Sequence, residues 1–197
     1  MIASARRSLS AFFATATLLA AGAVVPVAAQ ADFGNAQSCS SGQTSQPFAQ
    51  WGDSSSYALV SGGDFESSGW TLTRNAARVA GSEPFAATGS LGQSSLSLPA
   101  GSSATSPATC VDAGYPTMRF FISGSGTALV QVVYNGSAIP VGFVAAGGDW
   151  APSPVVRTGS ALFSVLGGGS AQVSLRLTAL TGDPQIDDVF IDPWNRG

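Results

Sequence analysis

The sequence contains no histidine and no lysine, and its basic side chains are eight arginines against eleven acidic residues. Without histidine, neither a Ser-His-Asp triad nor a Cys-His pair can form, and histidine-dependent zinc sites are excluded. Without lysine, a Schiff base or a Ser-Lys pair is impossible. The formal net charge of −3 argues against nucleic acid and anionic membrane surfaces as partners, because both require basic patches.

Motifs for phosphate binding are also missing, since no G-x-x-x-x-G-K-[ST] and no G-x-G-x-x-G after a strand occurs. The chemistry that remains is that of carboxylates, which glycosidases place about 5 to 9.5 Å apart. The available side chains are Glu66, Glu83, Asp112, Asp149, Asp183, Asp187, Asp188 and Asp192. No pattern pairs any two of them, so we expect a protein that is not an enzyme and assign no catalytic residue.

The first 31 residues are typical of an export signal. Arg6 and Arg7 precede an apolar run over 11–27, and Ala29-Gln30-Ala31 offers the small residues that signal peptidase recognises. A membrane anchor is the alternative, but a lasting span needs about 20 apolar residues, and Pro26 interrupts this run. We expect a secreted, extracellular or cell-surface protein without a membrane span after cleavage, exported by the general secretory or the twin-arginine route.

Two cysteines, Cys39 and Cys110, are present. In an exported protein an even pair predicts a disulfide. Such a bond would close a long loop and stabilise the fold by about 4 kcal/mol on the chain-entropy model. It would also attach a polar N-terminal arm over 32–56 to the middle of the domain.

The rest of the chain, 57–197, is expected to form a single all-β domain, an antiparallel β-sandwich of the jelly-roll type. Short runs with a period of two residues recur between Gly, Ser, Pro and Asn clusters. Strands are predicted at 57–60, 70–74, 77–80, 94–98, 118–123, 128–134, 139–144, 161–165, 171–180 and 185–192. No long apolar stripe of helical period is present, so helix should be minor.

Alternation also predicts which residues face the core. Met118, Phe120 and Ile122 should point inward, with Arg119 and Phe121 on the wet face. Asn135-Gly136, between two apolar runs, is the strongest short signal for a β-hairpin. Two packed sheets follow from this many short antiparallel strands.

Two short motifs stand at the ends of this domain. GGDFESSGWTL occupies 62–72 and QIDDVFI occupies 185–191. The pair resembles the galactose-binding-like jelly roll of secreted carbohydrate-binding modules, whose members often open with G-x-F-E…GW and close on I-D-[DN]-V-x-[LIV]. The whole chain also resembles small secreted proteins of actinobacteria. The resemblance implies this fold and, by analogy only, glycan binding.

The resemblance also implies a structural Ca²⁺ where the first and last strands meet. Glu66 matches the opening glutamate and Asp187 the closing aspartate, and Asp64 in the glycine-rich turn is a further possible ligand. Alternation places Asp187 on the core face and leaves Asp188 and Asp192 solvated, unless a bulge changes the register. The alternative is that Asp187 accepts backbone N–H bonds or pairs with an arginine.

Sugars are held by aromatic faces and a few polar groups, so the aromatic residues are the candidates for ligand binding. Trp51 and Trp150 lie in loop-like contexts, Tyr115 and Tyr134 are weaker candidates, and Trp70 alternates with Leu72 as a core residue would. Trp51 and Trp150 would instead cover an edge of the sandwich if no sugar binds. The partner is therefore a polysaccharide or cell-envelope glycan, or, alternatively, another protein; the oligomeric state is not fixed by the sequence.

Overall fold

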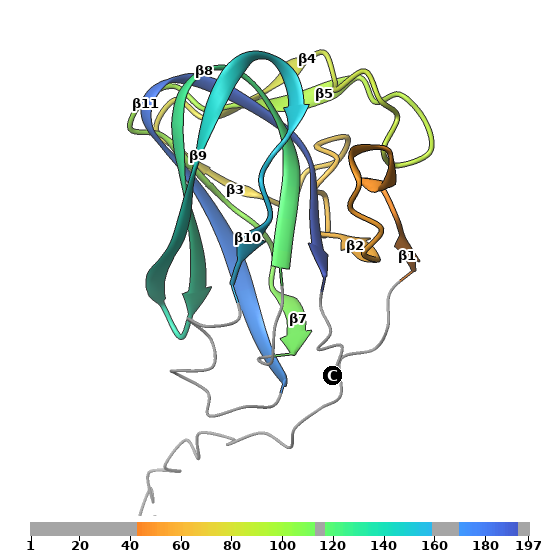
Figure 1. Cartoon of the computed structure of the whole chain (residues 1–197). Helices are drawn as coiled ribbons and strands as arrows, with labels where there is room; N and C mark the ends of the chain where they lie inside the picture. Colours follow the sequence, from red (N-terminus) through yellow and green to blue (C-terminus); the bar gives the residue numbers. More distant parts are fainter. Residues whose placement is uncertain (1–42, 113–116, 159–169, 193–197) are drawn as a thin grey trace, which may run out of the picture. The chain divides into compact units, whose positions relative to one another are not determined.

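The computed structural model describes residues 43–112, 117–158 and 170–192. Its elements are β1 (Thr44–Ser45), η1 (Ala49–Trp51), β2 (Tyr57–Leu59), β3 (Thr71–Thr73), β4 (Ala77–Ala80), β5 (Ser94–Ser97), β6 (Ser103–Thr105), β7 (Thr109–Asp112), β8 (Thr117–Tyr134), β9 (Ser137–Pro152), β10 (Val156–Arg157) and β11 (Ser170–Asp192). Every strand pairing is antiparallel, which confirms the predicted all-β sandwich (Figure 1). In the described part of the chain the one helix is the single 3-10 turn η1, and no helix there is long and apolar enough to cross a membrane.

The three longest strands, β8, β9 and β11, each contribute to both layers of the sandwich. They curve over together at the top of Figure 1, and their pairing continues through the bend. Gly126 and Gly182 lie in this bend with φ of +101° and +65°. A Cβ on Gly126 would lie 1.9 Å from the Thr181 oxygen, so only glycine allows the two strands to approach this closely.

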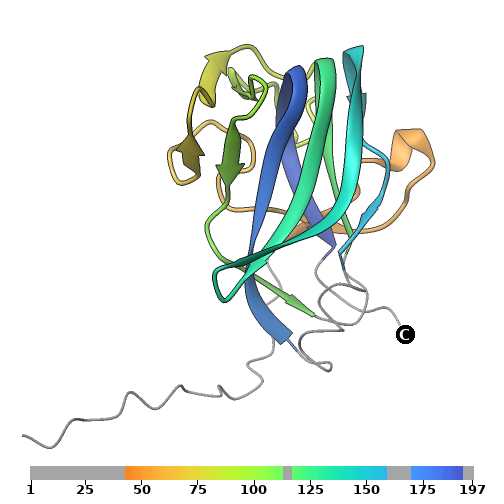
Figure 2. The same cartoon turned by 90° about the vertical axis from the view of Figure 1, so that its left-hand side faces the viewer.

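One layer contains the first half of β11 between β6 and β8, with β3 and β7 beside them and β9 next to β8. In the other layer, the second half of β11 lies between β8 and the short strands β2 and β5, which continue to β1 and β4. The turned view separates the long strands from the short ones (Figure 2). The main core fills the space between the layers. Its largest fully buried members are Phe65, Leu96, Leu98, Met118, Phe120, Leu175 and Leu177.

Most strand predictions are confirmed, but the structure adds four short strands that were not predicted, β1, β6, β7 and β10, and the long strands differ in their continuity. The runs predicted at 118–123 and 128–134 are one strand, β8, and those at 171–180 and 185–192 are one strand, β11. Glycines predicted to end strands instead bend them. The Asn135-Gly136 hairpin is confirmed, with φ of +47° and +78° between Tyr134 and Ser137. The predicted strand at 161–165 lies outside the described residues.

The N-terminal arm is packed on the domain over its described part. The described residues of the arm belong to the same compact unit as the domain, and Phe48 of the arm is fully buried against Tyr57, Phe121 and Phe190 on the outer face of the layer that contains β2 and β5. The prediction that Arg119 and Phe121 are wet is therefore wrong, since both are buried. Arg119 and Phe121 do lie on the face opposite the core residues of β8, as alternation predicts. That face is buried because the arm and the loop over 81–92 cover it.

Candidate functional site

A second apolar cluster lies on that covered face, and we call it the aromatic cluster. Its buried members are Phe48, Tyr57, Phe121 and Phe190; Trp51, Phe85 and Trp150 pack against them and remain half-buried. Phe121 and Phe190 alternate with core residues of β8 and β11, so they point away from the main core. The arm, the 81–92 loop and β9 each add half-buried aromatic rings over them.

Ring contacts connect these members. The centroids of Trp51 and Phe85 lie 4.9 Å apart with nearly perpendicular planes. Both rings contact Phe121, each at 5.4 Å, and Phe121 stacks on Phe48 at 5.3 Å. Such edge-on and tilted pairs are favourable geometries for aromatic rings. Trp51 and Phe85 are therefore held on buried aromatic rings, and Trp150 packs against the same cluster.

Arg119 forms a polar cluster at one side of the aromatic cluster. Its Nη1 donates to Asp53 Oδ2 at 2.9 Å, and its Nε and Nη2 donate to the Ser153 carbonyl at 2.9 and 2.7 Å. The guanidinium carbon lies 4.4 Å from the centroid of the Phe48 ring, a cation–π contact. We call Arg119, Asp53, Tyr57 and Ser153 the arginine cluster.

Asp53 is the charge partner in this cluster. Burial raises the pKa of its carboxyl, but hydrogen bonds from Tyr57, Ser55 and Arg119 outweigh burial and hold the pKa below its usual range. Burial and the hydrogen bond to Asp53 raise the pKa of Tyr57 to about 12. At neutral pH the cluster thus contains a carboxylate, a guanidinium and a protonated phenol.

A different polar cluster lies at another side, and we call Glu83, Asp187 and Asp188 the acid cluster. Asp187 Oδ2 accepts hydrogen bonds from Ser82 Oγ at 2.7 Å and from the Glu83 N–H at 3.0 Å. Its Oδ1 accepts from the Asp188 N–H at 2.9 Å. The Glu83 carboxylate accepts from the Phe85 N–H and, at 2.8 Å, from the Ala87 N–H. The cluster therefore connects the closing strand to the loop that carries Phe85.

Charge in the acid cluster is reduced by a proton. Burial, the charge of Asp187 and the hydrogen bond with Glu83 raise the pKa of Asp188 to about 8. Burial also raises the pKa of Asp187, to about 6, against hydrogen bonds from Ser82, Glu83 and Asp188 that lower it. The raised pKa of Asp188 favours its protonated form, with the proton directed to Glu83, more strongly than the raised pKa of Asp187 favours a proton there.

The solvated positions predicted for Asp188 and Asp192 are wrong: their exposed fractions are 3% and 7%. At Asp188 the strand contains a β-bulge, because the register shifts between the pairs Asp187–Phe121 and Phe190–Arg119, and Asp188 has φ of +46°. The bulge lets Ile186 and Val189 both enter the main core. Asp187 is buried as expected, but the prediction that it lies on the core face is wrong, because it is paired with Phe121 on the opposite, covered face. The alternative that it accepts backbone N–H bonds is confirmed.

The three residues predicted to bind calcium are held by protein hydrogen bonds. Glu66 Oε1 accepts from the Gln93 and Ser94 N–H groups at 2.6 and 2.8 Å, and Asp64 Oδ1 accepts from the Glu66 N–H at 3.3 Å. The Asp187 carboxylate accepts the three hydrogen bonds given above. Over the described ranges, no group of three or more acidic side chains is arranged to hold a metal ion. The residues do not fit as a preformed calcium site, and calcium stays a prediction from the sequence.

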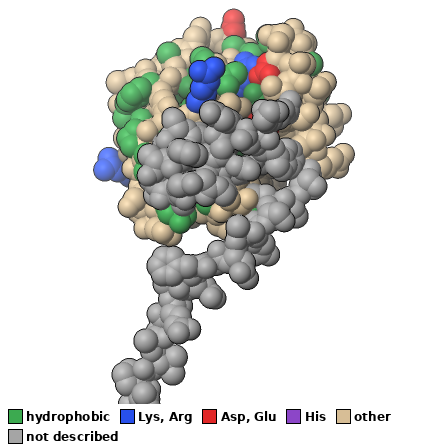
Figure 3. Space-filling view, turned by 60° about the horizontal axis from the view of Figure 1, so that its bottom comes forward, with side chains coloured by type: hydrophobic (Ala, Val, Ile, Leu, Met, Phe, Trp, Pro, Cys, Tyr) green, Lys and Arg blue, Asp and Glu red, His purple; other side chains and the backbone are tan. Residues whose placement is uncertain are grey.

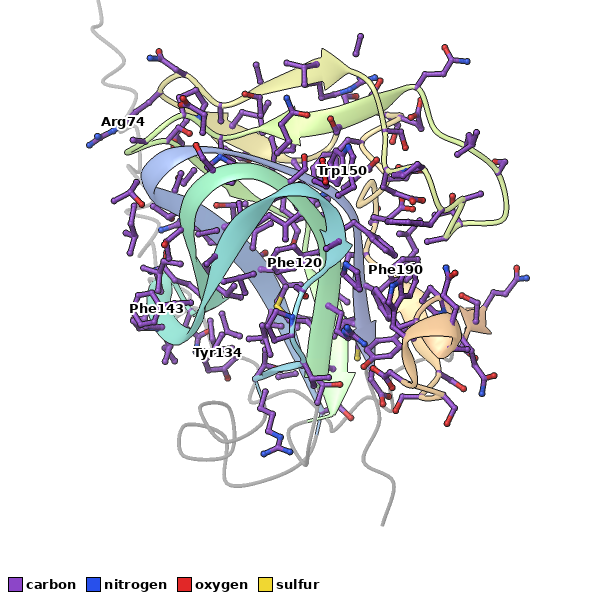
Figure 4. All side chains as sticks on the ribbon, turned by 45° about the horizontal axis from the view of Figure 1, so that its top comes forward. Arg74, Phe120, Tyr134, Phe143, Trp150 and Phe190 are labelled. Atoms are coloured by element: carbon purple, nitrogen blue, oxygen red, sulfur yellow. The ribbon has the colours of Figure 1, made fainter. Side chains whose placement is uncertain are left out.

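Of the predicted ligand-binding residues, Trp51 and Trp150 meet on the aromatic cluster. Tyr134 lies at the β8–β9 hairpin, at the opposite end of β9 from Trp150, and the two labelled residues lie well apart in Figure 4. Tyr115 lies outside the described residues. Trp70 is half-buried against the main core, where its Nε1 donates to the Ser61 carbonyl at 3.1 Å.

Phe85 and Arg119 were missed by the sequence reasoning. The Glu83-Pro84-Phe85 stretch has no period, so nothing in it signals a buried carboxylate that orients an aromatic ring. Arg119 looked like a solvated residue of an alternating strand. The only available signal for both was that Phe121 and Phe190, two large apolar residues, fall on the face opposite the core.

The predicted disulfide is described only at one end. Cys110 lies in β7 and is half-buried, and no described cysteine is a free thiol. Cys39 lies outside the described residues, so the Cys39–Cys110 pairing stays a prediction.

Together these features define an antiparallel β-sandwich with one aromatic face that buried polar clusters hold in place. Charged side chains are few on the described part of the face in Figure 3, and basic and acidic ones lie side by side near its top.

The structure is similar to several carbohydrate-binding modules at low sequence identity. One is the CsCBM6-3 module of Clostridium stercorarium in complex with cellobiose, with 12% identity over 70% of this chain and 91% of that chain and a TM-score of 0.44. Another is a Cellvibrio mixtus lichenase module with cellotriose, with 12% identity over 70% and 98% and a TM-score of 0.44. A third, the CBM22-1-GH10 modules of a Clostridium thermocellum xylanase with xylohexaose, has 15% identity over 71% and 28% and a TM-score of 0.44. No family model and no curated protein matches the sequence.

Proposed function

We propose that this protein is a secreted, non-catalytic module that binds a polysaccharide or cell-envelope glycan on the surface formed by Trp51, Phe85 and Trp150. The observation that carries the proposal is the convergence of these three half-buried rings, from three separate segments, on one aromatic base. A sugar ring has an apolar C–H face that packs on an aromatic ring, while its hydroxyls bond to polar groups at the rim. Exposed Gln50 and Asp149 directly precede the two tryptophans and supply such groups.

Preorganisation supports this use of the surface. Trp51 contacts both Phe85 and Phe121, and the Phe85 backbone N–H is held by the Glu83 carboxylate. A rigid aromatic surface loses little side-chain entropy on binding, which favours affinity. Export, which the N-terminal sequence predicts, would bring this surface to extracellular polysaccharides.

The test is affinity electrophoresis and calorimetry against a panel of soluble β-glucans, xylans, galactans and peptidoglycan fragments. The wild type should be retained by at least one glycan. Trp51→Ala and Trp150→Ala should each weaken binding by about tenfold or more, as expected for an aromatic anchor. Phe143→Ala is the matched control, because Phe143 is an aromatic residue on β9 with 67% exposure that does not belong to the aromatic cluster.

A second candidate is protein binding through exposed apolar side chains of β9 and β11, away from the aromatic cluster. Phe143 is directly opposite Leu129 in the β8–β9 register, and exposed Leu180 lies on neighbouring β11. If no glycan retains the wild type, the glycan proposal fails. Concentration-dependent association that Phe143→Ala abolishes would then favour protein contacts.

A further inference from the structure

Arg119 connects the two segments that carry the tryptophans of the aromatic surface. On one side it donates to Asp53, which follows Trp51 by two residues in the arm. On the other side it donates twice to the carbonyl of Ser153, which follows Trp150 by three residues, directly after the end of β9. No backbone pairing joins the described part of the arm to β9, so this side chain is a direct polar connection between them.

Both attachment points are themselves fixed. Asp53 also accepts from the Tyr57 hydroxyl at 2.8 Å and from the Ser55 N–H at 3.1 Å. The Ser153 N–H donates to the Phe120 carbonyl at 2.7 Å, and Ser153 Oγ accepts from the Phe120 N–H at 3.1 Å. Because both partners are held by further hydrogen bonds, a substitution of Arg119 should displace the segments that carry Trp51 and Trp150, not only the side chains that Arg119 contacts.

We propose that Arg119 is a positioning residue that fixes Trp51 relative to Trp150 and so sets the affinity for the glycan without touching it. This inference rests on the proposed function for its effect on binding, but its structural part holds without a ligand. The guanidinium suits the role because it is a planar fork that donates from two edges at once. A lysine ammonium, a single point on a flexible stem, cannot reach both partners with the same geometry.

The structural part is tested by ¹⁹F NMR of protein labelled with 5-fluorotryptophan, without any glycan. Signals are assigned with single Trp→Phe variants. Arg119→Lys should shift or broaden the signals of both Trp51 and Trp150 and leave that of Trp70 unchanged. Asp53→Asn removes the charge partner on one side only, so it should move the Trp51 signal and leave Trp150 in place. Arg119→Met repeats the test should the lysine variant not fold.

The functional part is tested by calorimetry with the glycan that binds the wild type best. Arg119→Lys should weaken binding by about fivefold, within the range for residues that act on a site without contacting the ligand. Arg157→Lys is the control, an exposed arginine in β10 expected to change neither readout. Unchanged Trp51 and Trp150 signals in Arg119→Lys would overturn the inference. If Arg119→Lys alters these signals but the wild type binds no glycan, the positioning role is retained and the proposed function is rejected.

Discussion

The arginine cluster and the acid cluster border the same aromatic cluster but balance their charge by different means. In the first, Arg119 and Asp53 form an ion pair at 2.9 Å. In the second, the described hydrogen bonds to the carboxyl groups come from Ser82 and from backbone N–H groups and not from an arginine, and the raised pKa of Asp188 favours a proton on that carboxyl. The comparison shows that one surface is supported by one cluster whose charge state is fixed near neutral pH and by another whose charge state changes there.

The largest effect is expected from Asp187→Ala. The substitution leaves the Ser82 hydroxyl and the Glu83 and Asp188 N–H groups without their acceptor, and the last two are buried donors. The free energy of unfolding should fall by about 3 kcal/mol. Urea unfolding measures it, with Asp183→Ala, an exposed position in the same strand, as a control that stays within about 0.5 kcal/mol. A loss below about 1 kcal/mol for Asp187→Ala contradicts the role assigned to the acid cluster.

The pH dependence of stability should come from the acid cluster. A carboxyl whose folded pKa is raised contributes stability that is complete below the unfolded pKa and is lost as pH rises through the folded pKa. For Asp188 that window runs from about pH 4 to about pH 8. In chelator-containing buffer, stability should fall with pH by up to about 1.4 kcal/mol per unit within it.

Asp188→Asn is the variant that isolates this dependence. Asparagine tolerates the positive φ of this position and keeps an N–H donor for Glu83, but it does not titrate. Denaturant unfolding at a series of pH values should give a clearly flatter profile for the variant. Equal slopes for wild type and variant would assign the pH dependence to other groups.

The contribution of the arginine cluster to stability should change in acid, below the pH range in which the acid cluster titrates. The Asp53 pKa is lowered, so its contribution is present above the unfolded pKa and is lost as pH falls through the folded value. Asp53→Asn should cost about 1 kcal/mol at neutral pH. The difference from wild type should disappear in acid, which thermal melts below pH 4 measure. A difference that persists in acid would mean that the Asp53 carboxylate is not the stabilising species.

The smallest effect is expected from calcium. Because Glu66, Asp64 and Asp187 accept hydrogen bonds from the protein, millimolar calcium should change the melting temperature by less than about 1 °C. Comparing melts with calcium and with a chelator tests this. A rise of several degrees that Glu66→Gln abolishes would instead establish the site that the sequence predicts.

Much of the sandwich was predictable because alternation and turn residues are local signals. Asn135-Gly136 identified its hairpin, and Met118, Phe120 and Ile122 identified a core face that is buried as expected. What failed depends on distant segments. Arg119 is buried only because the arm covers it, and Asp188 lies at a bulge in β11. Sequence reasoning selected Trp51 and Trp150 separately, but only the packing of the arm on β8 places both on one surface.

The bend at Gly126 and Gly182 has a consequence for how this domain can be divided. Because β8, β9 and β11 pass from one layer into the other, neither layer has a complete set of strands alone. A fragment limited to one layer would present unpaired strand edges to other chains and would tend to aggregate. The sandwich should therefore fold and unfold as a single cooperative unit, with β8–β11 pairing across a long sequence separation as its slow step.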